Sequence, residues 1–67
     1  MNTQVLKGEI VTAFGTQGKF AEFISWPENK VSRMMQGKYK PDTDEVYFIA
    51  QALNLSKEKF IQIFLCK

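Results

Sequence analysis

The sequence predicts an all-α fold: a compact bundle of four to five helices in one domain, residues 1–67. Apolar residues recur at intervals of three and four along most of the chain, which is the spacing of one helix face. No stretch alternates apolar and polar residues convincingly, as a half-buried strand does. Residues that cap or end helices stand between the apolar stretches. With 67 residues and 45% hydrophobic content, the chain can form one small core.

The first two helices are expected on either side of Gly15. The first covers residues 5–14 and has one apolar face, formed by Leu6, Ile10, Ala13 and Phe14. Gly15 suits the left-handed position after a helix, and Thr16 offers a side-chain oxygen to the next first turn. The inner face of the second helix comprises Phe20, Ala21 and Ile24. Gly18 should weaken this helix by up to about 1 kcal/mol relative to Ala.

A turn and a third helix follow. Ser25, Trp26 and Pro27 interrupt the apolar pattern. Proline disfavours helical dihedrals in the residue before it but fits a first helical turn, so the third helix is expected over residues 27–36. Its apolar side holds Val31 and Met34, with Met35 at the margin. Gly37 closes the helix, and residues 38–41 form a basic exit loop.

Two more helices complete the chain. Asp42 and Glu45 form a D-x-x-E capping box before an apolar face of Val46, Ile49, Ala50 and Leu53, and Asn54 ends this fourth helix. Ser56 caps a last helix that is apolar on more than one side. This surplus predicts either an interface with a second copy or partner, or a helix that wraps over the first. The expected interface residues are Phe60, Ile61, Phe64 and Leu65.

The outer side of the third helix is polar. At about 100° per residue, four side chains lie opposite its apolar side: Asn29, Ser32, Arg33 and Gln36. Glu28 and Lys30 flank them. Arg can pair with guanine, and Asn or Gln with adenine, although any amphipathic helix also has a solvated polar side. Residues 16–41 carry five basic and two acidic residues, a net +3, whereas the rest of the chain sums to −1.

Composition argues against several classes of protein. The single cysteine, Cys66, cannot form an internal disulfide, and without histidine it cannot build a zinc site. No window approaches the about 20 apolar residues of a membrane span, and the first residues lack a signal-peptide pattern. There is no pattern of an activated nucleophile or of paired acids. We therefore expect a cytoplasmic protein that is not an enzyme and needs no metal or cofactor.

Residues 16–42 resemble the helix-turn-helix of the lambda-type phage repressors and Cro proteins. The scaffold positions of that motif match without a gap at Thr16, Gln17, Ala21, Trp26, Val31, Ser32, Arg33, Met34, Gln36, Gly37, Lys38, Lys40 and Pro41. The opening LKGEIVTAFGTQGKFAEFI looks like small repressor-like proteins of phages that infect Gram-positive bacteria. The resemblance implies a lambda repressor-like DNA-binding domain with its helix-turn-helix core at residues 16–37, acting in a bacterial host cell.

The family's roles carry over to matching positions. The resemblance implies base contacts from Glu28, Asn29, Ser32 and Arg33. It implies phosphate contacts from Gln17, Lys30, Gln36, Lys38 and Lys40. Gln17 is similar to the family's glutamine that both bonds a phosphate and braces the recognition helix.

The chain departs from the family at several positions. Pro27 stands where relatives have a capping Ser or Thr, a loss of about 1 kcal/mol that the fixed proline dihedral partly offsets. Glu28 is acidic where relatives carry Gln or Arg. It could accept from cytosine or pair with Lys30 or Arg33. Ile10 and Met35 replace a partly buried ion pair of many relatives, so these two residues are predicted to touch.

Two aromatic residues beside the third helix have alternative roles. Trp26 is expected to anchor the turn against the core, rather than to contact DNA or a partner. Tyr39 could pack on the body or donate to a phosphate. The expected function is transcriptional regulation by a Cro-like phage repressor that binds operator DNA, with a homodimer as a further expectation. The alternative is a regulator that acts by binding a partner repressor protein through its apolar last helix.

Overall fold

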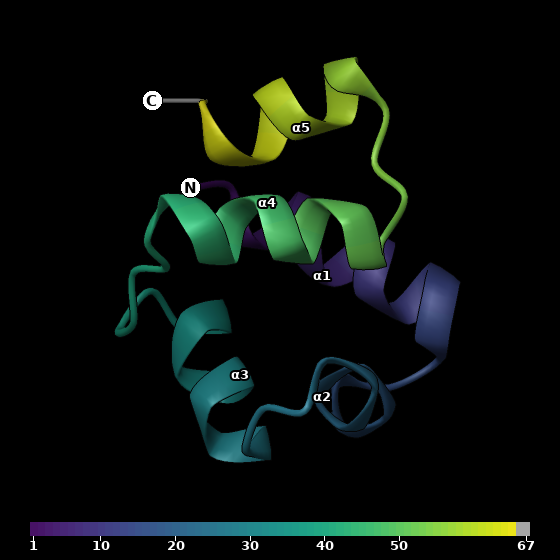
Figure 1. Ribbon diagram of the computed structural model, residues 1–67, viewed down its shortest axis with the longest axis vertical. Coiled ribbons are helices and arrows are strands. Elements are labelled where there is room, and N and C mark those ends of the chain that lie inside the picture. Colours follow the sequence, from purple (N-terminus) through teal and green to yellow (C-terminus); the bar gives the residue numbers. More distant parts are fainter. Residues whose placement is uncertain (66–67) are drawn as a thin grey trace.

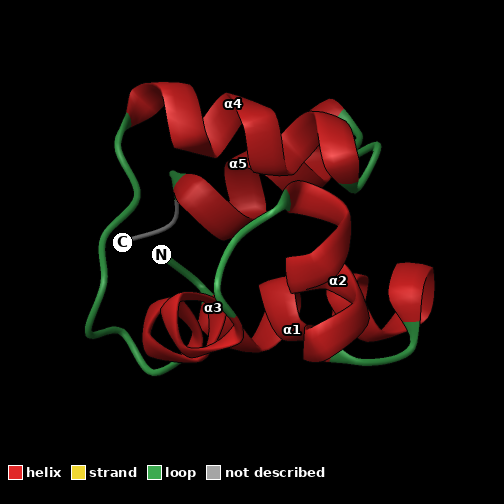
Figure 2. Ribbon diagram, turned by 60° about the horizontal axis from the view of Figure 1, so that its bottom comes forward, coloured by secondary structure: helices red, strands yellow, loops and turns green. Residues whose placement is uncertain are grey.

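Five helices make up the chain in this computed structural model, which describes residues 1–65 (Figures 1 and 2). In chain order they are α1 (Thr3–Phe14), α2 (Gln17–Ile24), α3 (Glu28–Met35), α4 (Thr43–Ala52) and α5 (Lys57–Phe64). No strand occurs in the described residues. The predicted all-α fold is confirmed. Among the same residues, no helix is both long and apolar enough to cross a membrane.

The core is built around α1, which packs against α2, α3 and α5. Figure 1 shows α2 and α3 at one end of the molecule and α5 at the other, with α4 in front of α1. Every helix contributes to one buried cluster, formed by Leu6, Ile10, Phe20, Ala21, Ile24, Val31, Met34, Ile49, Leu53 and Ile63. These helices are all short, so they depend on this shared core for their stability.

Side-chain caps begin four of the five helices. Thr16, Asp42 and Ser56 each accept a hydrogen bond from the backbone three residues on, and Glu45 completes the predicted capping box. The first helix begins earlier than expected, because Asn2 accepts from Val5 N–H at 3.2 Å and caps Thr3. Pro27 precedes α3 instead of forming its first turn, and α3 has no side-chain cap.

Three helices end in the same left-handed turn. After α3, Gly37 has φ 77°, its N–H donates to Met34 O, and Lys38 N–H donates to Arg33 O at 2.8 Å. This is the Schellman pattern of hydrogen bonds. The same pattern ends α2 at Ser25, φ 60°, and α4 at Asn54, φ 51°, where a glycine would be the unstrained residue.

One residue of an expected apolar helix face needs correction. Ala13, expected on the apolar face of the first helix, is exposed. In α5 the buried residue is Ile63, while Ile61 and, just after the helix, Leu65 are exposed. Met35 is partly buried against the cluster that contains Ile10, but direct contact between these two residues stays a prediction. Cys66 lies outside the described residues.

Candidate nucleic-acid interface

The outward side of α3 is available to a ligand because its other side is fixed in the core. Val31 and Met34 are fully buried. Glu28, Asn29, Arg33 and Gln36, all expected at the interface, are exposed, and Ser32 is half-buried between the two sides. The structure therefore brings the expected base-contacting side chains to one surface.

Gln17 connects the first turn of α2 to this surface. Its Oε1 accepts a hydrogen bond from the Ser32 hydroxyl at 3.4 Å, a long and therefore weak bond. The bond agrees with the bracing role implied by the family resemblance. Gln17 is half-buried, so part of its side chain still faces solvent beside α3.

Glu28 lies over the start of α2. A Cβ built on Gly18 would meet Glu28 Oε2 at 2.6 Å, so the carboxylate occupies space that only glycine leaves open. The unpaired N–H groups of a helix N-terminus favour a nearby negative charge. The alternatives in which Glu28 pairs with Lys30 or Arg33 are not what the structure shows, because Lys30–Glu45 is the one ion pair within residues 1–65.

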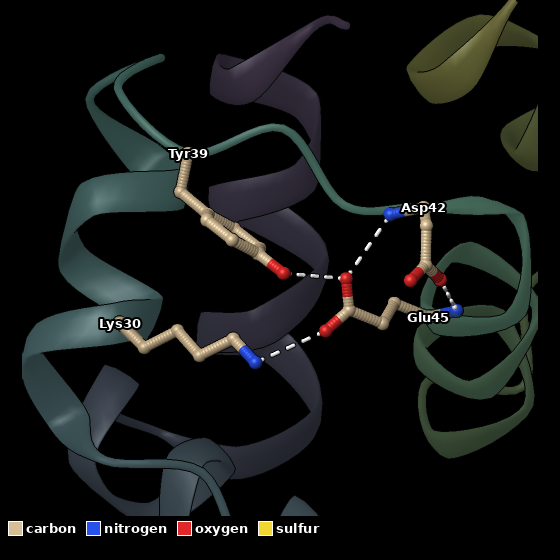
Figure 3. A network of polar contacts seen from close by, with 4 residues as sticks. All are labelled: Lys30, Tyr39, Asp42 and Glu45. Atoms are coloured by element: carbon tan, nitrogen blue, oxygen red, sulfur yellow. Dashed lines mark hydrogen bonds and ion pairs between the residues drawn. The ribbon is translucent and has the colours of Figure 1, made fainter.

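Lys30 was expected to contact a phosphate, but its ammonium group is directed toward α4 (Figure 3). Its Nζ lies 3.0 Å from Glu45 Oε2 and 4.0 Å from the centre of the Trp26 ring. The Tyr39 hydroxyl donates to Glu45 Oε1 at 2.6 Å, and Asp42 N–H donates to the same oxygen at 3.0 Å. We call this group, Lys30, Tyr39 and Glu45, the α3–α4 brace.

The pKa values of the three groups in the α3–α4 brace are shifted in the directions that these contacts require. Hydrogen bonds from Tyr39, from the Asp42 backbone and from Lys30 lower the pKa of Glu45 to about 2. The bond to Glu45 raises the pKa of Lys30 and also that of Tyr39. The three groups therefore hold one negative carboxylate, one ammonium and one neutral phenol at neutral pH.

The two aromatic residues beside α3 pack on the body of the molecule. Trp26 and Tyr39 are half-buried against the core cluster, with their rings 6.1 Å apart and nearly perpendicular. The expected anchoring role of Trp26 agrees with this position. Of the two roles considered for Tyr39, the structure supports packing, since its hydroxyl is bonded to Glu45.

A hollow of about 270 Å³ opens on the same side of α3, lined by Asn29, Lys30, Arg33 and Tyr39. Lys38 and Lys40 are exposed on the exit loop, as is Gln36 at the end of the helix. The positive charges of Lys38 and Lys40 follow α3 directly in the chain, which suits the phosphate-contacting role expected of them. No group of acid or cysteine side chains that could hold a metal ion occurs in the described residues.

A second surface lies between α4 and α5. A groove of about 350 Å³ is lined mainly by apolar residues, among them Val46, Tyr47, Phe60, Phe64 and Leu65. Tyr47 stacks on Phe60 with ring centres 5.9 Å apart. Of the four expected interface residues, Ile61 and Leu65 are exposed, and Phe60 and Phe64 are half-buried.

Comparison of the chain with protein-family models, curated proteins and solved structures finds no match.

Proposed function

We propose that this protein is a small transcriptional regulator that binds double-stranded operator DNA by placing α3 in the major groove. The observation that carries the proposal is the exposed face of α3, where Asn29 and Arg33 stand beside a hollow while Val31 and Met34 fix the helix in the core. Both side chains have the donor geometry that recognises base edges. The resemblance of residues 16–42 to Cro-like phage repressors supports the same role.

In this proposal the contacts with DNA are divided between two sets of residues. Gln17, Gln36, Lys38 and Lys40 contact phosphates and set the orientation, whereas Glu28, Asn29, Ser32 and Arg33 read bases. A bound dimer would occupy two half-sites and exclude other proteins from the operator, which is repression by occlusion. Affinity should fall with salt, with a slope of about −0.9 for each phosphate neutralised.

Selection of bound sequences from random duplex DNA tests the proposal. We expect enrichment of a palindrome whose half-sites are about one helical turn apart. A variant with Arg33 replaced by Ala should lose specificity at one position of each half-site. The absence of any enriched sequence would contradict the proposed function.

A second candidate function is regulation by binding another protein, such as a partner repressor. The groove between α4 and α5 favours it, because two of its lining residues, Tyr47 and Leu65, leave 59% and 63% of their surface exposed. The net charge of only +2 also favours it, since many DNA-binding domains are more basic. In this case the groove, and not α3, would be the functional surface.

A further inference from the structure

The α3–α4 brace lies where the two helices are otherwise weakly connected. Backbone packing joins α3 to α1 and α2, while α4 is not among the helices that pack closely on it. The segment between them, residues 36–42, contains the exit loop, residues 38–41. The polar contacts of Glu45 cross this gap (Figure 3).

One carboxylate connects three parts of the structure: α3, the exit loop and α4. Glu45 on α4 accepts from Lys30 on α3, from Tyr39 in the exit loop and from the backbone of Asp42 at the start of α4. The Trp26 ring, in the turn before α3, lies under the same Lys30 ammonium. Hydrogen bonds to a charged carboxylate are strong and depend on geometry. A carboxylate that accepts from three donors therefore fixes the relative positions of those donors.

We propose, given the DNA binding proposed above, that Lys30 is a positioning residue for the reading face and not a phosphate contact. Lys30 and Tyr39 form two walls of the hollow whose other walls are Asn29 and Arg33. Holding Tyr39 against Glu45 therefore fixes the shape of this hollow and the path of the loop that carries Lys38 and Lys40. A phosphate could attract Lys30 only by drawing the ammonium away from Glu45 and the Trp26 ring.

The two roles of Lys30 predict opposite results when Glu45 is changed to Gln. Gln can still complete the capping box, so α4 should keep its N-terminus. If Lys30 is a positioning residue, Glu45→Gln releases it, because the amide nitrogen that replaces Oε2 cannot accept from an ammonium group, and we expect operator affinity to fall about 5- to 30-fold. If Lys30 contacts a phosphate, the same change frees the ammonium and removes a negative charge, so affinity should stay equal or rise.

The experiment compares the full chain with Glu45→Gln, Lys30→Met and the double variant on a selected operator at several salt concentrations. We expect Glu45→Gln and Lys30→Met to lose similar amounts of operator affinity. The double variant should lose no more affinity than either single variant. The salt slope should remain that of the unmodified chain. A slope smaller by about 0.9 in Lys30→Met alone, or full affinity in Glu45→Gln, would overturn the proposal.

Two further measurements keep the result interpretable. Alkaline absorbance titration should detect Tyr39 ionising at lower pH in Glu45→Gln, because the carboxylate that raises the pKa of Tyr39 is gone. Tyr39→Phe removes one hydroxyl without a charge and should also weaken operator binding with an unchanged salt slope. Unaltered binding would count against the brace.

The outcomes separate the two proposals. If the unmodified chain binds no duplex DNA, both the proposed DNA binding and the positioning role of Lys30 fail. If it binds but Glu45→Gln binds equally well, only the positioning role of Lys30 fails.

Discussion

Glu28 covers Gly18: the Glu28 carboxylate lies where a side chain on Gly18 would begin, 2.6 Å from the position of a Cβ. The first residue of α3 thus rests on the first turn of α2. From the sequence alone, Gly18 predicted only that the second helix would be less stable than with Ala at this position. The structure shows that its missing side chain also allows the close approach of an acidic residue proposed to read DNA.

Replacing Gly18 by Ala should raise stability by up to about 1 kcal/mol, since Ala has the higher helix propensity. The clashing atom is the end of the flexible, exposed Glu28 side chain, which can turn away. Thermal unfolding followed by circular dichroism would measure a rise of about 4–8 °C per kcal/mol. Gly8→Ala is a matched control, because a Cβ there meets nothing within 4 Å. A lower midpoint for Gly18→Ala alone would mean that Glu28 cannot move.

Replacing Ser25 by Gly should stabilise the turn between α2 and α3 by about 0.5–1 kcal/mol. Ser25 has φ 60°, a conformation that is strained for every residue with a Cβ. The gain is limited because glycine also loosens the unfolded chain. Urea unfolding should show a higher midpoint for Ser25→Gly but not for Ser25→Ala. Equal midpoints for the two variants would contradict this explanation.

Acid should weaken the fold partly through Glu45. Its pKa is about 2 in the folded protein and 4.5 in the reference state, so the unfolded chain binds the proton more tightly. The contribution of this group is present above about pH 4.5 and is lost as the pH falls toward 2. We expect the urea midpoint of the unmodified chain to fall more between pH 5 and pH 2.5 than that of Glu45→Gln. Parallel curves would show that Glu45 is not a source of acid sensitivity.

Removing the Arg33 side chain should weaken operator binding by about 1–3 kcal/mol and relax specificity at one base pair. Arg33 is exposed and its side chain is not needed for the core, so the fold should remain intact. Lys57→Ala on α5 is a suitable control for the loss of one positive charge. An operator gel shift that is the same for Arg33→Ala and Lys57→Ala would remove Arg33 from the reading face.

The groove between α4 and α5 can be tested by Leu65→Asp. Leu65 is 63% exposed, so a charge there should leave the folded chain intact while disrupting an apolar interface. If this surface joins two copies or a partner, sedimentation should show a smaller assembly. Val11→Asp on α1 is the control, as Val11 is exposed on another helix. Identical sedimentation of both variants and the unmodified chain would argue against an interface at the groove.

Local sequence signals predicted the helix ends well. Thr16, Asp42 with Glu45, and Ser56 cap helices as expected, because a cap depends on residues only three positions apart. Gly15 and Gly37 end helices at positive φ for the same local reason. Ser25 was not predicted as a left-handed residue, because serine gives no signal for that conformation.

Contacts between distant residues were harder to predict. Glu45 was recognised only as a cap, and its bonds to Lys30 and Tyr39 depend on how the exit loop folds back. For the same reason Lys30 was assigned by its position in the motif and not by the direction of its side chain. The segment from Lys57 to Leu65 has apolar residues on several sides, so periodicity could not show that Ile63 is buried and Leu65 exposed.

The packing of α1 against α2, α3 and α5, with α4 less closely attached, has a consequence for local opening. If α4 separates from the rest of the protein before global unfolding, Glu45 leaves Lys30 and Tyr39, and the exit loop loses its attachment. Backbone amides of α4 and of the exit loop should then exchange with solvent as one unit, faster than those around Leu6 and Ile10. The exit loop and α3 would then differ in mobility, although they adjoin in the chain.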